Sequence, residues 1–415
     1  MTFSFPLFGV GFLLVLIQIV AAIPWLMVSN WEALRRSASG SAKSSGELWR
    51  MVGTAVLVAL GVALGAAAVL GGGLVQDREG LQLLGRLYAS ILHLQLLADA
   101  LILVFWLLLL AWPKGGAVAL AAFREGLRQP MFWLLAGAAL LLLLTSPFVP
   151  YFTFGEDYVV VQELGFDTIM LVCVLLGVLS ASMSISEEIE GRTAITLMSK
   201  PVSRRQFLLG KFVGIFLVTL LLTGLLGWFF QWVLLAKHWY EKMDPVPPPQ
   251  ALGATLDYLG LSMQPSLLLF GAGLWIADVC SNAAGLILGS CQVMVLLAIA
   301  VALATRLPMI PNLVICWVVY TFGHLTPVLA QVAARKQDLD PGSPAGRLLA
   351  FTSQVFDIAL PGLEFFNLAP ALAMDAPLPL GAFSRYVASV VLDGLLYTII
   401  ALLFGLVLFE DRDLA

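Results

Sequence analysis

The sequence predicts an all-α fold, a polytopic membrane helix bundle with about 9–10 transmembrane helices. Hydrophobic residues make up 60% of the 415 residues and charged residues 12%, whereas about a quarter of a soluble domain is charged. Apolar runs recur along the chain, and many reach the roughly 20 residues that a helix needs to cross a bilayer. The polar intervals between these runs differ in the sign of their charge, as cytoplasmic and external loops do.

The N-terminal part predicts three spans, at about residues 7–27, 51–75 and 91–112. No basic residue precedes the first apolar run, whereas three arginines and a lysine lie between residues 29 and 50. The positive-inside rule therefore places that loop in the cytoplasm and the N-terminus outside. We expect the first span to be a retained anchor, because the basic start of a cleaved signal peptide is missing.

Further along, residues 118–129 predict a helix at the membrane surface, because Arg124 and Arg128 accompany an apolar face just before Pro130. The polar stretch at 236–263 contains a run of prolines and is expected to be an external loop. Crossing helices around these segments are expected at 131–149, 166–183, 212–235 and 386–408.

The longest orderly polar segment predicts a cytoplasmic hairpin of two short helices. Ser184 and Glu187 have the spacing of a capping box, so we expect a helix to begin there. Pro201 ends that helix because it cannot donate a backbone hydrogen bond. Ser203 and Gln206 repeat the capping spacing and predict the start of a second helix.

The same segment carries a longer pattern of acids, a proline turn and a basic helix start. Its residues are Glu187, Glu188, Glu190, Gly191, Thr193, Leu197, Ser199, Pro201, Val202, Ser203, Arg204, Gly210 and Lys211. This pattern resembles the membrane permeases of ABC transporters in the type-2 exporter class. The chain departs from the family at Arg192, which separates Gly191 from Thr193. An ordinary capped cytoplasmic loop is the alternative interpretation.

The resemblance implies a partner and a mechanism. Residues 184–212 would form a coupling hairpin that docks into a separate ABC ATPase subunit, present in two copies. A second permease protomer, identical or different, would complete the transporter in the lipids of the cytoplasmic (inner) membrane. In the expected contacts, Glu187, Glu188 and Glu190 meet polar or basic groups of the ATPase, Leu197 and Met198 pack in its groove, Arg204 and Lys211 hold the hairpin at the headgroups, and Gly191, Thr193 and Pro201 complete the motif.

The resemblance also implies a division of the chain. Residues 116–415 would form a six-span permease core that begins with an elbow at 118–129, and residues 1–115 would be a three-helix addition to it. An outer surface segment is expected at 332–382, where residues 360–367 resemble the family's outer-leaflet helix.

The stretch from 264 to 306 has two interpretations. It is too long for one crossing and contains Asp278, Ser281 and Asn282, so it predicts either two tight spans or a non-crossing helix at 264–279 before one span at 285–305. Two spans would leave the C-terminus outside, and one would place it inside. Basic residues in the next loop favour two spans, whereas the resemblance favours one, and we prefer one.

Catalysis in this chain has no support in the sequence. There is no G-x-x-x-x-G-K-[ST] phosphate loop, so ATP hydrolysis is expected in a partner chain. The four cysteines and three histidines show no metal-ligand or nucleophile spacing, and we expect no cofactor, metal or catalytic residue. A net charge of -4 implies no nucleic-acid partner.

Asp99, Asp167 and Asp393 lie within predicted spans, where a charge is costly and by default faces a partner, a cavity or a pathway. They define the first alternative function, an ion-coupled secondary transporter. The second alternative is a non-transporting membrane protein that anchors a cytoplasmic partner.

Overall fold

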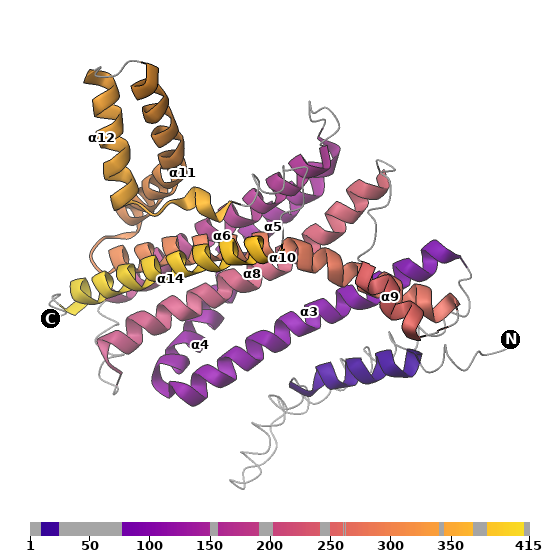
Figure 1. Cartoon of the computed structure of the whole chain (residues 1–415). Coiled ribbons are helices and arrows are strands. Elements are labelled where there is room, and N and C mark those ends of the chain that lie inside the picture. The colour runs from indigo at the N-terminus through magenta and orange to yellow at the C-terminus, as the bar shows by residue number, and fades with distance from the viewer. Residues whose placement is uncertain are drawn as a thin grey trace, which may run out of the picture. The chain divides into compact units, whose positions relative to one another are not determined.

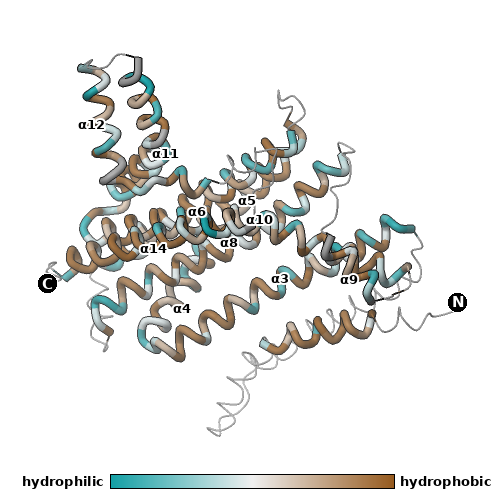
Figure 2. The backbone as a smooth tube through the Cα atoms, viewed as in Figure 1, coloured by the Kyte–Doolittle hydropathy of each residue, from teal (hydrophilic) through white to brown (hydrophobic). Residues whose placement is uncertain are grey.

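A computed structural model describes residues 10–24, 77–149, 157–190, 202–240, 250–259, 261, 263–339, 344–367 and 380–410. Within these ranges the chain is helical, and seven helices are long and apolar enough to cross a membrane. The predicted all-α membrane bundle is thereby confirmed. Figure 2 shows the apolar character along these helices.

The helices of the described ranges follow one another along the chain as Figure 1 shows. The long ones are α3 (Arg78–Ala111), α5 (Pro130–Thr145), α6 (Asp157–Glu190), α8 (Arg204–Tyr240), α10 (Met263–Ala304), α11 (Met309–Leu339) and α14 (Leu380–Glu410). Shorter elements are a helix at Val10–Pro24, α4 (Pro113–Arg128), η1 (Ser146–Phe148), α9 (Gln250–Leu259), α12 (Pro344–Ala359) and η2 (Leu363–Phe366).

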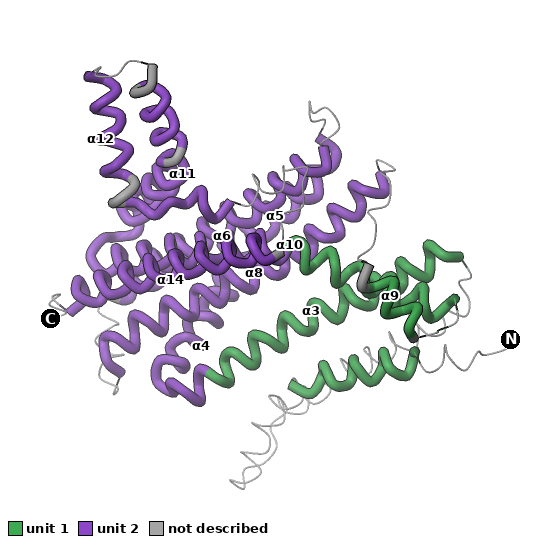
Figure 3. Tube along the Cα trace, viewed as in Figure 1, with its two compact units in different colours: residues 1–107, 242–282 green, residues 108–241, 283–415 purple. Residues whose placement is uncertain are grey.

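The chain forms two compact units, which Figure 3 distinguishes by colour. Unit 1 consists of Met1–Leu107 and Lys242–Asn282, and unit 2 of Leu108–Glu241 and Ala283–Ala415. The helix α10 contributes its first part to unit 1 and its second part to unit 2. The predicted division at residue 115 stays a prediction.

In unit 1, the helix α3 lies directly against the first part of α10. A Cβ atom on Gly271 would stand 2.1 Å from the carbonyl oxygen of Gln82, so the two backbones are in contact. Arg86 forms an ion pair of 3.1 Å with Asp278 across this interface. The hydroxyl of Tyr88 donates a 2.7 Å hydrogen bond to the carbonyl of Leu14, which holds the N-terminal helix to α3.

In unit 2, the core lies between α6, α8 and the second part of α10. Leu176, Leu222 and Leu297 are at most 1% exposed. The rings of Phe166 and Phe230 meet edge to face with their centroids 5.7 Å apart. The helices α11 and α12 pack against each other and project side by side from the rest of unit 2 (Figure 1).

The prediction of a break within residues 264–306 was wrong, because α10 is one continuous helix of 42 residues. The hydroxyl of Ser281 and the amide of Asn282 donate hydrogen bonds of 2.8 and 3.0 Å to the carbonyl of Asp278, one turn back. These polar side chains are satisfied within the helix and do not end it. A single helix of about 63 Å cannot fold back on itself, which excludes two tight spans here.

The two capping predictions had opposite outcomes. The prediction that a helix begins at Ser184 was wrong, because α6 runs unbroken through this position to Glu190. At the start of α8, the amide of Ser203 donates to the side chain of Gln206 at 3.1 Å, and the amide of Gln206 donates to the hydroxyl of Ser203 at 3.2 Å. This reciprocal pair confirms the second capping box.

Candidate functional site

The site begins with the close approach of α4 to α8. A Cβ atom on Gly214 would stand 2.4 Å from the carbonyl oxygen of Ala119, and one on Gly210 would stand 2.9 Å from that of Gly115. Glycines four residues apart on one helix lie on the same face and let a neighbouring backbone approach. The helix α4 is therefore seated on the first turns of α8, and this brings Glu125 within reach of α8.

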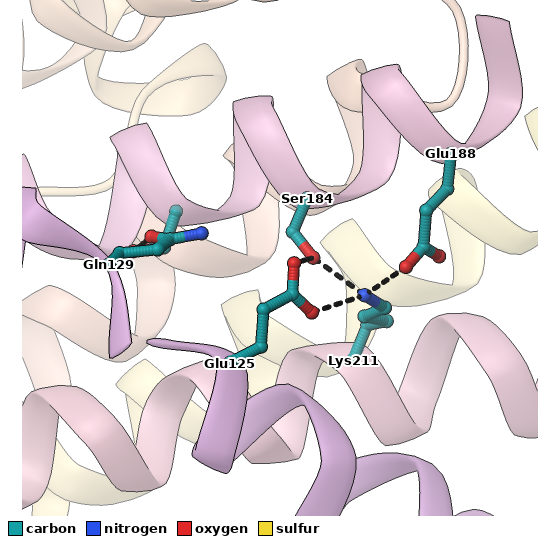
Figure 4. Close-up of polar contacts among 6 residues, drawn as sticks. Glu125, Gln129, Ser184, Glu188 and Lys211 are labelled. Atoms are coloured by element: carbon teal, nitrogen blue, oxygen red, sulfur yellow. Dashed lines mark hydrogen bonds and ion pairs between the residues drawn. The ribbon is translucent and has the colours of Figure 1, made fainter. Parts of the chain in front are cut away.

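Lys211 is the centre of a polar cluster that joins three helices, and Figure 4 shows the side chains converging on its ammonium. Its Nζ atom donates hydrogen bonds to Glu188 Oε1 at 2.6 Å, Ser184 Oγ at 2.6 Å and Glu125 Oε2 at 3.0 Å. Ser184 in turn donates to Glu125 Oε1 at 3.2 Å. We call these four residues the Lys211 cluster.

The Lys211 cluster is partly shielded from solvent and holds two carboxylates on one cation. The side chain of Lys211 is 5% exposed, that of Glu188 23% and that of Glu125 43%. Burial raises the pKa of Glu188; the charge and hydrogen bond of Lys211 oppose this shift, and the charge of Glu125 adds to it. Removing either the cation or its shielding would therefore change the protonation of this end of α6.

A row of serines along the last turns of α6 attaches this helix to its neighbours on two faces. Residues four apart share a face of a helix. Ser180 and Ser184 lie on one face, and Ser180 donates at 3.4 Å to Gln129, just after α4. On the other face, Ser182 accepts from Asn312 of α11 at 2.9 Å.

Ser186 shares the second face and binds the end of α10. Its hydroxyl donates to the carbonyls of Leu307 at 3.0 Å and Ala304 at 3.4 Å. Each serine in the row thus has a neighbouring element as its partner. The alternating serines in S-A-S-M-S-I-S were the sequence signal for this arrangement, and sequence reasoning did not use it.

Apart from Arg204, the predicted coupling residues fall into three groups in the structure. Glu187 and Glu190 lie on the last turn of α6. Lys211 and Glu188 are brought together in the Lys211 cluster. The remaining predicted residues between the two helices, Gly191, Thr193, Leu197, Met198 and Pro201, lie outside the described residues.

Two basic residues were expected at the lipid headgroups, and the structure gives both of them protein partners. The Lys211 ammonium is enclosed by the cluster. One guanidinium nitrogen of Arg204 donates to the carbonyls of Phe409 at 3.0 Å and Glu410 at 2.9 Å. Sequence reasoning missed both sets of partners.

The three aspartates that were predicted to lie within spans are on different helices. Asp99 is buried on α3 in unit 1. In unit 2, Asp393 is exposed on α14, whereas Asp167 on α6 lies within range of the charges of Glu163, His324 and Glu364. His324 also contacts the Gln292 side chain at 3.1 Å.

Comparison with known proteins places the described geometry in a wider context. A family model described as ABC-2 family transporter protein matches residues 127–270, which contain α5, α6, residues 191–201 and α8. No curated protein matches the chain. The match includes Ser184, Glu188 and Lys211, and it begins two residues after Glu125.

Proposed function

We propose that the chain is an ABC-2 type permease, as the family model that matches residues 127–270 supports, and that its segment 184–212 receives the movement of a separate ABC ATPase and passes it to the membrane helices. The match to the ABC-2 family supports a role in membrane transport and a partnership with such an ATPase.

The observation that carries the proposal is the Lys211 cluster. Glu188 stands at the end of α6 and Lys211 near the start of α8, so their 2.6 Å ion pair joins the two helices that flank residues 191–201. Glu125 adds the elbow helix α4 to the same cation. A force on the intervening segment would therefore reach three helices together.

The contacts with the ATPase follow from this arrangement. Glu187 and Glu190 would meet polar or basic groups of the ATPase, and Leu197 and Met198 would pack in its groove. Gly191, Thr193 and Pro201 would shape the turn between the helices. Glu188 has an internal role in this account, because Lys211 binds its carboxylate.

The assembly would contain two ATPases and two permease protomers, identical or different, in the cytoplasmic (inner) membrane. ATP-driven closure of the ATPases would push on both coupling segments and tilt the helices. The substrate would then gain access to the opposite side of the membrane or be lifted from it.

Contacts at the helix ends support an inward-facing C-terminus. The start of α8 contacts the end of α14 through Arg204, and Arg306, just after α10, contacts α14 as well. If α8 begins in the cytoplasm, then α10 and α14 both end there. This fits one crossing by α10, and it places Arg335 and Lys336 of α11 outside despite the positive-inside rule.

The test is ATP hydrolysis by the ABC ATPase with and without the full-length permease in lipid nanodiscs. We expect hydrolysis to rise when the complex forms. The variant Glu187→Lys with Glu190→Lys should lose this stimulation, because it reverses the charge beside the coupling segment. The matched control, Asp77→Lys with Glu79→Lys, reverses two exposed acids at the start of α3 and should keep it. Full stimulation by the first variant would contradict the proposal.

A further inference from the structure

The backbone of the last turn of α14 is bound by two arginines from other parts of unit 2, and a third, Arg205, pairs with the exposed side chain of Glu410 at 2.8 Å. Arg204, the first residue of α8, donates to the carbonyls of Phe409 and Glu410 at 3.0 and 2.9 Å. Arg306, two residues after α10, donates to the carbonyl of Leu408 at 2.9 Å. Three successive carbonyls of one helix end are therefore bound by guanidinium groups. We call Arg204 and Arg306 the arginine clamp.

An aromatic contact fixes the same helix end. Phe409 is 0% exposed and lies against Phe207 of α8, which is 1% exposed, with the ring centroids 6.1 Å apart. The guanidinium carbon of Arg204 lies 5.8 Å from the centroid of the Phe409 ring. The end of α14 is thus anchored to the first turn of α8 by both apolar and polar contacts.

These contacts supply what a helix end lacks. The last four carbonyls of a helix have no partner within the helix, and the partial negative charge at this end favours cations. Here the cations are Arg204, at the start of α8, and Arg306, just after the end of α10. Arg204 follows the segment 191–201 by three residues, and Arg306 follows the end of the buried helix α10.

The rest of α14 packs with one face on α10, where a Cβ atom on Gly405 would stand 2.8 Å from the Cα atom of Ala302 and where Val390 and Leu402 are buried. Along its membrane-spanning length many large apolar side chains face outward, including Leu396, Ile400 and Phe404, each at least 50% exposed. The arginine clamp joins the end of this helix directly to α8 and to the residues just after α10. The clamp is therefore placed to decide how α14 moves when α8 moves.

We propose that the arginine clamp transmits movement of the coupling segment to α14, the last membrane helix, so that Arg204 and Arg306 are positioning residues for transport. The inference rests on the proposed function, because it takes the ATPase as the source of movement. In this account, movement of the ATPase reaches two sets of helices. The Lys211 cluster moves α4, α6 and α8 together, and the clamp moves α14 with them.

A fluorescent reporter at each of two positions tests the inference in the full permease–ATPase complex in nanodiscs. Cys280 is exposed and would be replaced by serine, whereas Cys173, Cys291 and Cys316 are buried. An environment-sensitive dye on Val407→Cys, 57% exposed, reports on α14. The same dye on Leu164→Cys, 42% exposed, reports on α6. ATP with vanadate is the stimulus.

With an intact clamp, we expect both reporters to respond to ATP. In Arg204→Ala with Arg306→Ala, the response at 407 should fall several-fold, because the contacts to the three carbonyls are lost, whereas the response at 164 remains. Lysine at both positions keeps the positive charge and should restore part of the 407 response. The control Arg128→Ala removes an exposed arginine of α4 and should leave both responses intact.

Two results would overturn the inference: an unchanged 407 response in the double alanine variant, or no 407 response in the intact protein while 164 responds. Failure of the proposed function looks different. In that case the ATPase neither binds the unsubstituted permease nor changes either reporter, and the inference falls with it.

Discussion

The ammonium of Lys211 lies 2.6 Å from a carboxylate oxygen of Glu188, although the two residues are 23 positions apart in the chain. This ion pair joins the end of α6 to the start of α8. Because the Lys211 side chain is 5% exposed, the contact is shielded from the solvent and salt that weaken surface ion pairs.

Replacing Lys211 with methionine should destabilise the protein by about 3 kcal/mol, because it leaves two carboxylates facing each other without their cation. The value lies at the low end of the range for broken buried pairs, since Glu125 is 43% exposed. Unfolding in a denaturant titration of the purified permease measures it.

The matched control for this change is Arg124→Met, which removes an exposed cation from the elbow helix. It should alter the free energy of unfolding by less than about 0.5 kcal/mol. Equal effects of the two substitutions would show that the Lys211 cluster does not stabilise the fold.

The pH dependence of stability should show the raised pKa of Glu188. Burial favours the protonated carboxyl in the folded state, so this contribution is complete below the ordinary pKa of 4.5 and is lost as the pH rises through the higher folded value. Glu188→Gln removes the titrating group. Its melting temperature minus that of the unsubstituted protein should therefore increase as the pH rises from about 4 to about 8. A difference that stays constant or decreases would contradict the assignment.

Gly214→Val should separate the elbow helix from α8. The added Cβ atom would stand 2.4 Å from the carbonyl oxygen of Ala119, which is backbone and cannot rotate away. We expect a loss of about 3 kcal/mol in the free energy of unfolding, at the upper end for overpacking. The control is Gly137→Val on α5, where nothing lies within 4 Å of the new Cβ atom. A similar loss in both variants would contradict the close approach.

In unit 1, Gly271→Val should release α3 from the first part of α10, because its Cβ atom would stand 2.1 Å from the carbonyl oxygen of Gln82. Hydrogen exchange of the α3 amides near Arg86 should become faster, whereas exchange in α8 stays unchanged. Gly253→Val on α9, which meets nothing within 4 Å, is the control. Unchanged protection of α3 would contradict this interface.

Local patterns allowed the helical fold and one of the two capping boxes to be predicted from sequence. Ser203 and Gln206 lie three residues apart, so both partners of the capping box are visible in the sequence. The same spacing at Ser184 misled the prediction. There the apolar helix continues, and the serine hydroxyl is engaged by Glu125 and Lys211.

Contacts between distant residues could not be predicted in the same way. Glu125 and Lys211 are 86 positions apart, and only the seating of α4 on the α8 glycines brings them together. Arg204 reaches a carbonyl 206 positions away. The predicted break in α10 failed for a local reason, because Ser281 and Asn282 bind a carbonyl of their own helix.

Site-specific photo-crosslinking tests the central claim, that the ATPase meets the permease at the coupling segment. A photoreactive amino acid would replace Arg205 at the start of α8, where the side chain is 69% exposed, or Tyr240 at its other end, which is 66% exposed. In the assembled complex we predict a crosslink to the ATPase from position 205 and none from position 240. A crosslink from 240 with none from 205 would contradict the account.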